Sequence, residues 1–111
     1  MGNKYGLLEA DVNRVRARDA RCVYCRKAMV EPGARGSSTR DWATIEHLNH
    51  LPPWDNAETI AICCGSCNAS RGPKPLMQWF GSPYCQQRGI SPSTVARPVV
   101  DYIRKHEGYN G

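Results

Sequence analysis

Cys22-Val-Tyr-Cys25 and Cys64-Gly-Ser-Cys67 are two CxxC motifs, and they decide the fold of this chain. The two-residue spacing within each motif lets both thiolates of one turn face the same ion. Two such motifs predict a tetrahedral site of four cysteines, for which zinc is the suitable metal. Because four thiolates fill the coordination shell, we expect this zinc to be structural.

The other cysteines fit the zinc site less well. Cys63 could in principle replace Cys64, but its distance from Cys67 breaks the matched spacing, and Cys63 suits the buried end of a strand better. Cys85 has no assignment. Unrelated buried thiols or a thioredoxin-like redox pair are the alternatives, and the matched spacing of the two motifs argues against both. The 38 residues between Cys25 and Cys64 must contain further structure.

The size and composition of the chain agree with a small, stapled domain. With 111 residues we expect a single domain over residues 1–111. Its eight prolines and ten glycines interrupt the periodic segments that would build a core, so we expect the core to be small. The start of the chain has no basic stretch followed by an apolar run, so we expect a cytoplasmic protein with reduced cysteines. No run approaches the roughly 18 consecutive apolar residues of a membrane span.

Charge is distributed unevenly around the net value of +5. Residues 1–42 carry nine Lys and Arg against five Asp and Glu, residues 43–62 carry none against three, and residues 63–111 carry six against two. Two basic flanks therefore enclose an acidic centre. This pattern is typical of a phosphodiesterase, in which carboxylates hold a divalent metal while cationic flanks hold the nucleic-acid backbone.

The periodicity of the sequence predicts a small α+β fold with helices flanking a short sheet. Turn-forming residues fill 31–40, which we expect to be a flexible basic loop. The expected elements are a basic helix at about 7–20, strands at 43–48 and 59–63, a helix after Cys67 that is interrupted at 72–75 and resumes over 76–80, and a last helix from Pro92 or Pro98 through Lys105.

Between the cysteine motifs lies the dipeptide Glu46-His47 on a predicted strand, and Asn68 directly follows the second motif. The combination of CxxC, an acid-His dipeptide and CxxCN followed by basic residues resembles the HNH nuclease family. The resemblance covers about Cys22 to Lys74. It implies a ββα-metal core at about 22–75 with a helical C-terminal tail at about 76–107.

The resemblance also implies roles for individual residues. Glu46 and Asn68 would bind a catalytic Mg²⁺ or Mn²⁺, and His47 would be the general base that takes a proton from the attacking water. The implied reaction is hydrolysis of DNA to a 5′-phosphate product, with one strand nicked per active site in a monomer or homodimer. Because neighbouring strand residues point to opposite faces, bringing Glu46 and His47 into one site implies a bend or bulge in the strand.

The residue that orients His47 stays open at this stage. Asn56, which we favour slightly, Thr59 and a backbone carbonyl are the alternatives, because the family's middle asparagine matches a position close to Thr59. His50 could meet a phosphate, assist the metal or face solvent. Arg71 and Lys74 could contact DNA phosphates or be ordinary solvated charges.

Two other functions fit the same cysteine motifs. One is a non-catalytic zinc ribbon that binds nucleic acid by charge, in which Glu46 and His47 are incidental strand residues. The other is a zinc-dependent redox switch. Trp42, Trp54 and Trp79 could stack on bases, although core or loop anchors are the better prediction for so small a domain.

Overall fold

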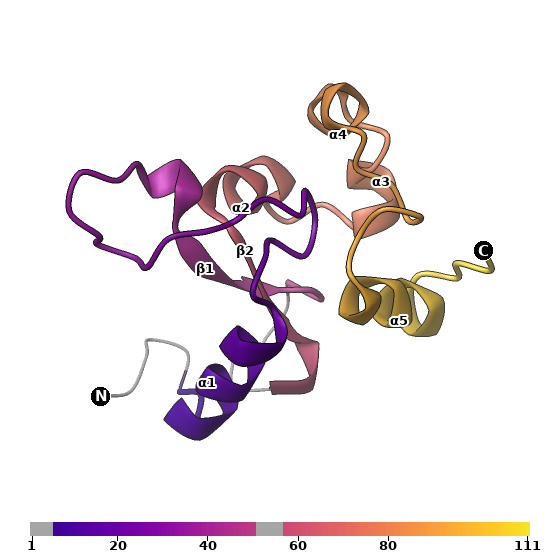
Figure 1. The fold of residues 1–111 in the computed structure, drawn as a ribbon. Coiled ribbons are helices and arrows are strands. Elements are labelled where there is room, and N and C mark those ends of the chain that lie inside the picture. The colour runs from indigo at the N-terminus through magenta and orange to yellow at the C-terminus, as the bar shows by residue number, and fades with distance from the viewer. Residues whose placement is uncertain (1–5, 51–56) are drawn as a thin grey trace.

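The computed structural model describes residues 6–50 and 57–111. In these ranges the chain forms a two-stranded antiparallel sheet surrounded by helices, so the predicted α+β class is confirmed (Figure 1). The elements in chain order are α1 (Glu9–Arg18), the short 3₁₀ turn η1 (Thr39–Asp41), β1 (Ala43–His47), the 3₁₀ turn η2 (Ala57–Thr59), β2 (Ile60–Cys64), α2 (Gly65–Arg71), α3 (Leu76–Trp79), α4 (Pro83–Arg88) and α5 (Arg97–His106).

The two strands pair residue for residue along their whole length. Ala43 lies opposite Cys64 at one end of the sheet, and His47 lies opposite Ile60 at the other. No extra residue interrupts this register, so the bulge expected near Glu46 is wrong. Glu46 and His47 therefore face opposite sides of β1, as the alternation of an ordinary strand requires.

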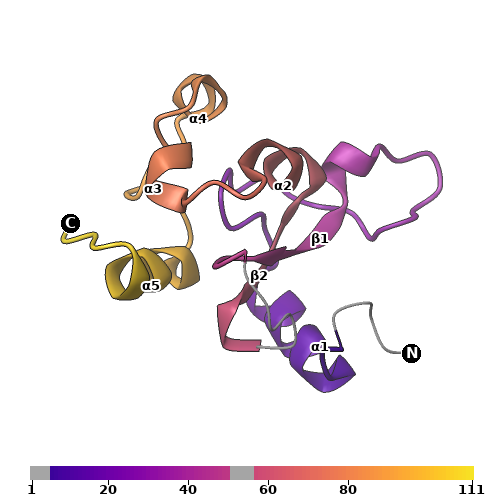
Figure 2. The ribbon, with the colours of Figure 1, turned by 180° about the vertical axis from the view of Figure 1, so that it is seen from behind.

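Every residue of β2 is buried because both faces of the sheet are covered. Ile60 and Ile62 pack with Val12 and Val15 of α1 on one face. The other face, which carries Cys63, packs on a larger core. Figures 1 and 2 show α1 and α2 on opposite sides of the sheet. A strand covered on both sides has no polar face, which explains the continuous apolar run that precedes the second cysteine motif.

The second cysteine motif is itself the first turn of α2. Cys64 caps the helix, and its thiol accepts a hydrogen bond from the backbone N–H of Cys67. The helix consequently begins at Gly65, earlier than predicted. A Cβ atom at Gly65 would lie 2.0 Å from the carbonyl oxygen of Thr39, so only glycine fits where η1 crosses the helix.

The C-terminal tail contains three helices, of which α4 was not expected from periodicity. Ser82 caps α4 by accepting a hydrogen bond from the N–H of Cys85, and Gly89 ends the helix with a φ of 67°. The last helix begins next to Pro98, which decides between the two predicted starts. Trp79 is fully buried in the main core, as predicted for an anchor, whereas Trp54 lies outside the described residues.

Candidate metal centre and its neighbours

The four cysteines of the two motifs converge on one point. The sulfur atoms of Cys22, Cys25, Cys64 and Cys67 all lie within 4.8 Å of one another, and those of Cys25 and Cys64 are 3.9 Å apart. A tetrahedral zinc with Zn–S bonds of about 2.3 Å needs sulfur atoms about 3.8 Å apart. The cluster therefore fits a structural metal ion such as zinc, and the predicted grouping is confirmed.

Backbone hydrogen bonds shape the turn that carries the first CxxC motif, which we call the first knuckle. The N–H of Cys22 donates to Lys27 O, and the N–H of Arg26 donates back to Cys22 O, both over 3.0 Å. Arg26 takes a positive φ of 67° to close this turn. Cys63 stays outside the cluster, with its sulfur 3.9 Å from the hydroxyl of Thr44. Choosing Cys64 over Cys63 as the fourth ligand agrees with this arrangement.

Helix α4 contacts the cysteine cluster through Tyr84. The hydroxyl of Tyr84 donates to the sulfur of Cys67 over 3.2 Å and lies 2.9 Å from the hydroxyl of Ser66. The guanidinium of Arg88 stacks on the Tyr84 ring, 3.7 Å from its centre. Hydrogen bonds to ligand atoms orient a metal site, so Tyr84 is a supporting residue that sequence reasoning missed. Its signal was the cap of α4, which places Tyr84 in the first turn of that helix.

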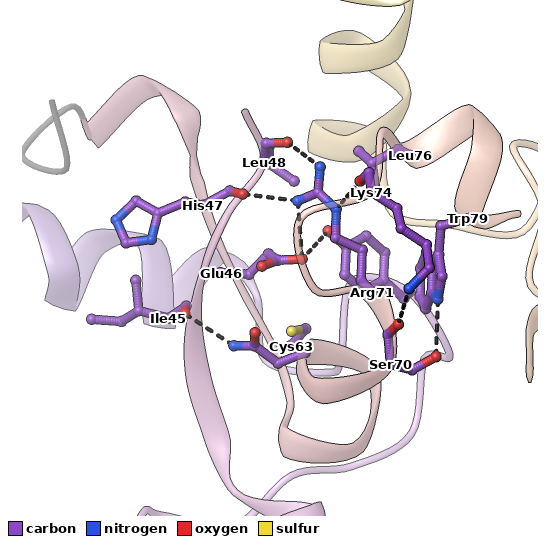
Figure 3. Close-up of polar contacts among 12 residues, drawn as sticks. Ile45, Glu46, His47, Leu48, Cys63, Ser70, Arg71, Lys74, Leu76 and Trp79 are labelled. Atoms are coloured by element: carbon purple, nitrogen blue, oxygen red, sulfur yellow. Dashed lines mark hydrogen bonds and ion pairs between the residues drawn. The ribbon is translucent and has the colours of Figure 1, made fainter. Parts of the chain in front are cut away.

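Glu46 lies in the interior, on the side of the sheet that faces α2 (Figure 3). Its Oε2 accepts a hydrogen bond of 2.7 Å from the hydroxyl of Tyr24 and an ion pair of 3.4 Å from the Nη1 of Arg71. Burial raises the pKa of the Glu46 carboxyl to about 7, despite the opposing effects of Arg71 and Tyr24. The structure thus gives this carboxylate protein partners of its own.

Arg71 is the most heavily bonded side chain near Glu46. Its guanidinium is 2% exposed, and it donates to Lys74 O over 2.6 Å, His47 O over 2.8 Å and Leu48 O over 2.6 Å (Figure 3). These three bonds tie the end of β1 to the turn after α2. We expected Arg71 on the surface as a phosphate contact, and the structure instead places it in the core.

The side chain of His47 points away from Glu46 and Arg71, and its ring is buried on the opposite side of β1 (Figure 3). Asn68 belongs to α2, and its side chain contacts β1. Its amide nitrogen donates to Thr44 Oγ1 over 3.0 Å and to Ile45 O over 3.1 Å. Because a carbonyl can only accept, these bonds orient the amide and leave its oxygen as the atom that could bind a metal.

The remaining predicted residues fall in different places. Asn56 lies outside the described residues. Thr59 is buried, and its carbonyl accepts a hydrogen bond from Leu48 N. His50 is exposed at a positive φ of 49°, and the exposed Lys74 donates to Ser70 O. Asn56 as the residue that orients His47 therefore stays a prediction.

The two predicted metal sites differ in the metal-ligating side chains that the fold brings together. Among residues 6–50 and 57–111, the four cysteines are the one group of three or more His, Cys, Asp or Glu side chains close enough to share an ion. Glu46 belongs to β1, and the side chain of Asn68 reaches β1 from α2; both offer oxygen atoms, which suit a hard divalent cation. The Oε2 atom of Glu46 already contacts Tyr24 and Arg71, so a cation at this atom would compete with both.

Comparison with protein-family models found no match, and comparisons with curated proteins and with solved structures found none either. In the described part of the chain, every helix is too short or too polar to cross a membrane.

Proposed function

We propose that this chain is a zinc-stapled, metal-dependent DNA endonuclease of the HNH type. The observation that carries the proposal is the contact of Asn68 with β1, through the carbonyl of Ile45 directly before Glu46. This contact brings Asn68 onto the strand that carries Glu46 and His47, whose side chains lie on opposite faces of β1. A zinc ribbon needs none of these three residues for its metal site.

In this proposal His47 accepts a proton from the attacking water, a role for which an imidazole is suited near neutral pH. The Glu46 carboxylate and the Asn68 amide oxygen would hold Mg²⁺ or Mn²⁺, which would supply charge stabilisation at the scissile phosphate when bound. One site per chain cuts one strand, so a monomer nicks, whereas a two-fold dimer could cut both strands.

The contacts of Glu46 within the protein would have to be exchanged before this carboxylate binds a cation. Arg71 is held by three carbonyl bonds of 2.6 to 2.8 Å, whereas its contact with Glu46 is 3.4 Å. The longest contact is the one most easily exchanged. A turn of Glu46 towards a cation would exchange this contact and the 2.7 Å hydrogen bond from Tyr24, while Arg71 stays in place on its carbonyl bonds.

The test is digestion of supercoiled plasmid by zinc-loaded protein with Mg²⁺, with Mn²⁺ or with neither. We expect open-circular product that needs one of these metals. Replacement by His47→Ala should lower the rate at least a hundredfold, as expected for loss of a general base. Because His47 is buried, His47→Gln is the second variant, since it keeps volume and hydrogen bonding but cannot take the proton.

Each variant is accepted only if it binds as much zinc as the parent and melts cooperatively, and Glu31→Gln serves as an exposed control. Intact plasmid under all metals, or equal cutting by folded His47→Gln, would refute the nuclease proposal.

A second function, a non-catalytic nucleic-acid-binding module, is favoured by the engagement of Glu46. A carboxylate that is 2% exposed and bonded to Tyr24 and Arg71 has a structural role without any metal. This function predicts that the protein retards duplex DNA in a gel, while plasmid stays supercoiled in every metal.

A further inference from the structure

Two adjoining cavities form a groove between α1 and α5, which we call the α1–α5 groove. One cavity, of about 400 Å³, is lined by Arg18, Arg21, Arg26 and Arg97. The other, of about 500 Å³, shares Arg18 and Arg97 and continues to Leu48, next to His47. Figures 1 and 2 show α1 and α5 on either side of the start of β2, which forms part of the groove wall.

The groove carries an excess of positive charge. In the first cavity four arginines accompany a single acid, Asp19. That acid is 5% exposed, and its carboxylate is already bonded to Arg18 and to Ile62 N. The second cavity adds Lys105 and two acids, of which Asp101 pairs with Arg97. The cations that line the groove outnumber its acids, so guanidinium groups remain available to bind an anion from outside the protein.

The cations of the groove come from both basic flanks of the sequence. Arg21 and Arg26 belong to the first flank, and Arg97 and Lys105 belong to the last. The fold joins the flanks where the N–H of Ala96 donates to Val23 O over 2.8 Å. Segments that repel each other by charge lie side by side at a price in electrostatic free energy, which an anionic partner would relieve.

The backbone at Arg26 gives an independent reason to assign a role to its side chain. The turn after Cys25 requires a φ of 67° there, a conformation that glycine adopts freely and that is sterically unfavourable for arginine. The backbone of this turn therefore gains nothing from an arginine. The Arg26 side chain is exposed. The backbone carbonyl of Arg26 accepts a hydrogen bond from the side chain of Arg21, which lines the same cavity.

We propose that the α1–α5 groove binds the phosphodiester backbone of duplex DNA and leads it towards the end of β1 that carries His47. Guanidinium groups suit this partner because each can bind a phosphate through two parallel hydrogen bonds. The inference names the substrate-binding surface of the proposed nuclease and in that respect rests on the proposed function. Binding by the groove can nevertheless be measured without any cleavage.

The test is fluorescence anisotropy of a labelled 20-base-pair duplex with zinc-loaded protein, in the absence of Mg²⁺ and Mn²⁺, at several salt concentrations. The groove variant combines Arg21→Gln, Arg26→Gln and Arg97→Gln, all at exposed positions. The control variant combines Arg14→Gln, Arg35→Gln and Arg40→Gln, which are also exposed and lie outside the groove. Both variants change the net charge equally.

We expect the groove variant to bind at least tenfold more weakly and to lower the slope of log K against log salt by up to about 2.7, since each of three lost phosphate contacts removes about 0.9. The control variant should lose less than threefold. Equal losses in the two variants, no binding by the parent, or competition by polyglutamate as strong as that by DNA would overturn the inference.

The plasmid assay separates this inference from the nuclease proposal. If the parent binds through the groove but cuts nothing, the groove stands and the nuclease proposal fails. If nicking that depends on His47 continues at the parent rate in the groove variant, at substrate concentrations below saturation, the groove fails and the nuclease proposal stands.

Discussion

The two ends of the short sheet are built on different principles. At the end where Ala43 pairs with Cys64, four thiols converge within 4.8 Å of one another. At the end where His47 pairs with Ile60, the buried Glu46 is met by Arg71 and Tyr24. The cysteine end could hold a structural metal ion such as zinc, whereas the carboxylate at the Glu46 end already has partners within the chain. A metal would therefore complete the first site, whereas at the second it would compete with the protein's own side chains.

The largest effect that can break this comparison is loss of the ion at the cysteine end. Replacement by Cys64→Ser, or removal of zinc with a chelator, should abolish cooperative unfolding, because structural zinc contributes on the order of 10 kcal/mol to small domains. The matched control is the neighbouring Cys63→Ala, which should keep a full complement of zinc. Metal content and circular dichroism on heating measure both variants. A Cys64→Ser protein that melts within a few degrees of the parent would contradict the assignment of this end.

The next effect concerns the internal pairing at the Glu46 end. Arg71→Met should destabilise the protein by about 3–5 kcal/mol, because it leaves a buried carboxylate unpaired together with three backbone carbonyls. Arg104→Met at an exposed site is the control and should stay within about 0.5 kcal/mol of the parent. Urea unfolding measures both free energies. A cost below about 1 kcal/mol for Arg71→Met would mean that this end does not depend on the guanidinium.

The pH dependence of stability tests the burial of Glu46. Its pKa is raised in the folded protein to about 7 from an ordinary value of 4.5, so the folded state binds more protons between these values and the unfolding free energy falls as pH rises through this window. A shift of this size corresponds to about 3 kcal/mol. In Glu46→Gln this fall should disappear.

The measurement is urea unfolding of zinc-loaded parent and Glu46→Gln from pH 5 to pH 8.5, without Mg²⁺ or Mn²⁺. Other titrating groups are common to both proteins and cancel in the difference. Parallel curves for the two proteins would show that Glu46 titrates near its ordinary pKa and is not desolvated as the structure indicates.

The smallest expected effect returns to the cysteine end. Tyr84→Phe removes one hydroxyl that bonds to Cys67 and Ser66, and should cost about 1 kcal/mol while leaving one zinc per chain. It should also speed the transfer of zinc to a competing chelator, since orienting partners strengthen metal binding. Unchanged transfer kinetics would limit Tyr84 to packing. The matched control is Tyr109→Phe, a half-buried tyrosine outside the cluster.

The sequence by itself determined the grouping of the four cysteines, the two strands and most of the helices, because these follow from spacing and alternation over a few residues. Strand alternation also predicted that Glu46 and His47 face opposite sides, and the bulge inferred from the resemblance is absent from the register. The cap residues Ser82 and Gly89 indicate α4 in the sequence, but this helix is too short to show an apolar period.

Only the tertiary structure decided where the charged side chains went. Arg71 reads as a surface cation because nothing near it in the chain indicates burial, yet it lies in the core where acceptors from β1 and from Lys74 converge. Arg26 and Arg97 meet across the α1–α5 groove because the start of α5 bonds to the first knuckle. Local patterns specify elements, whereas partners of a charge are contributed by segments distant in sequence, and only the folded chain brings those segments together.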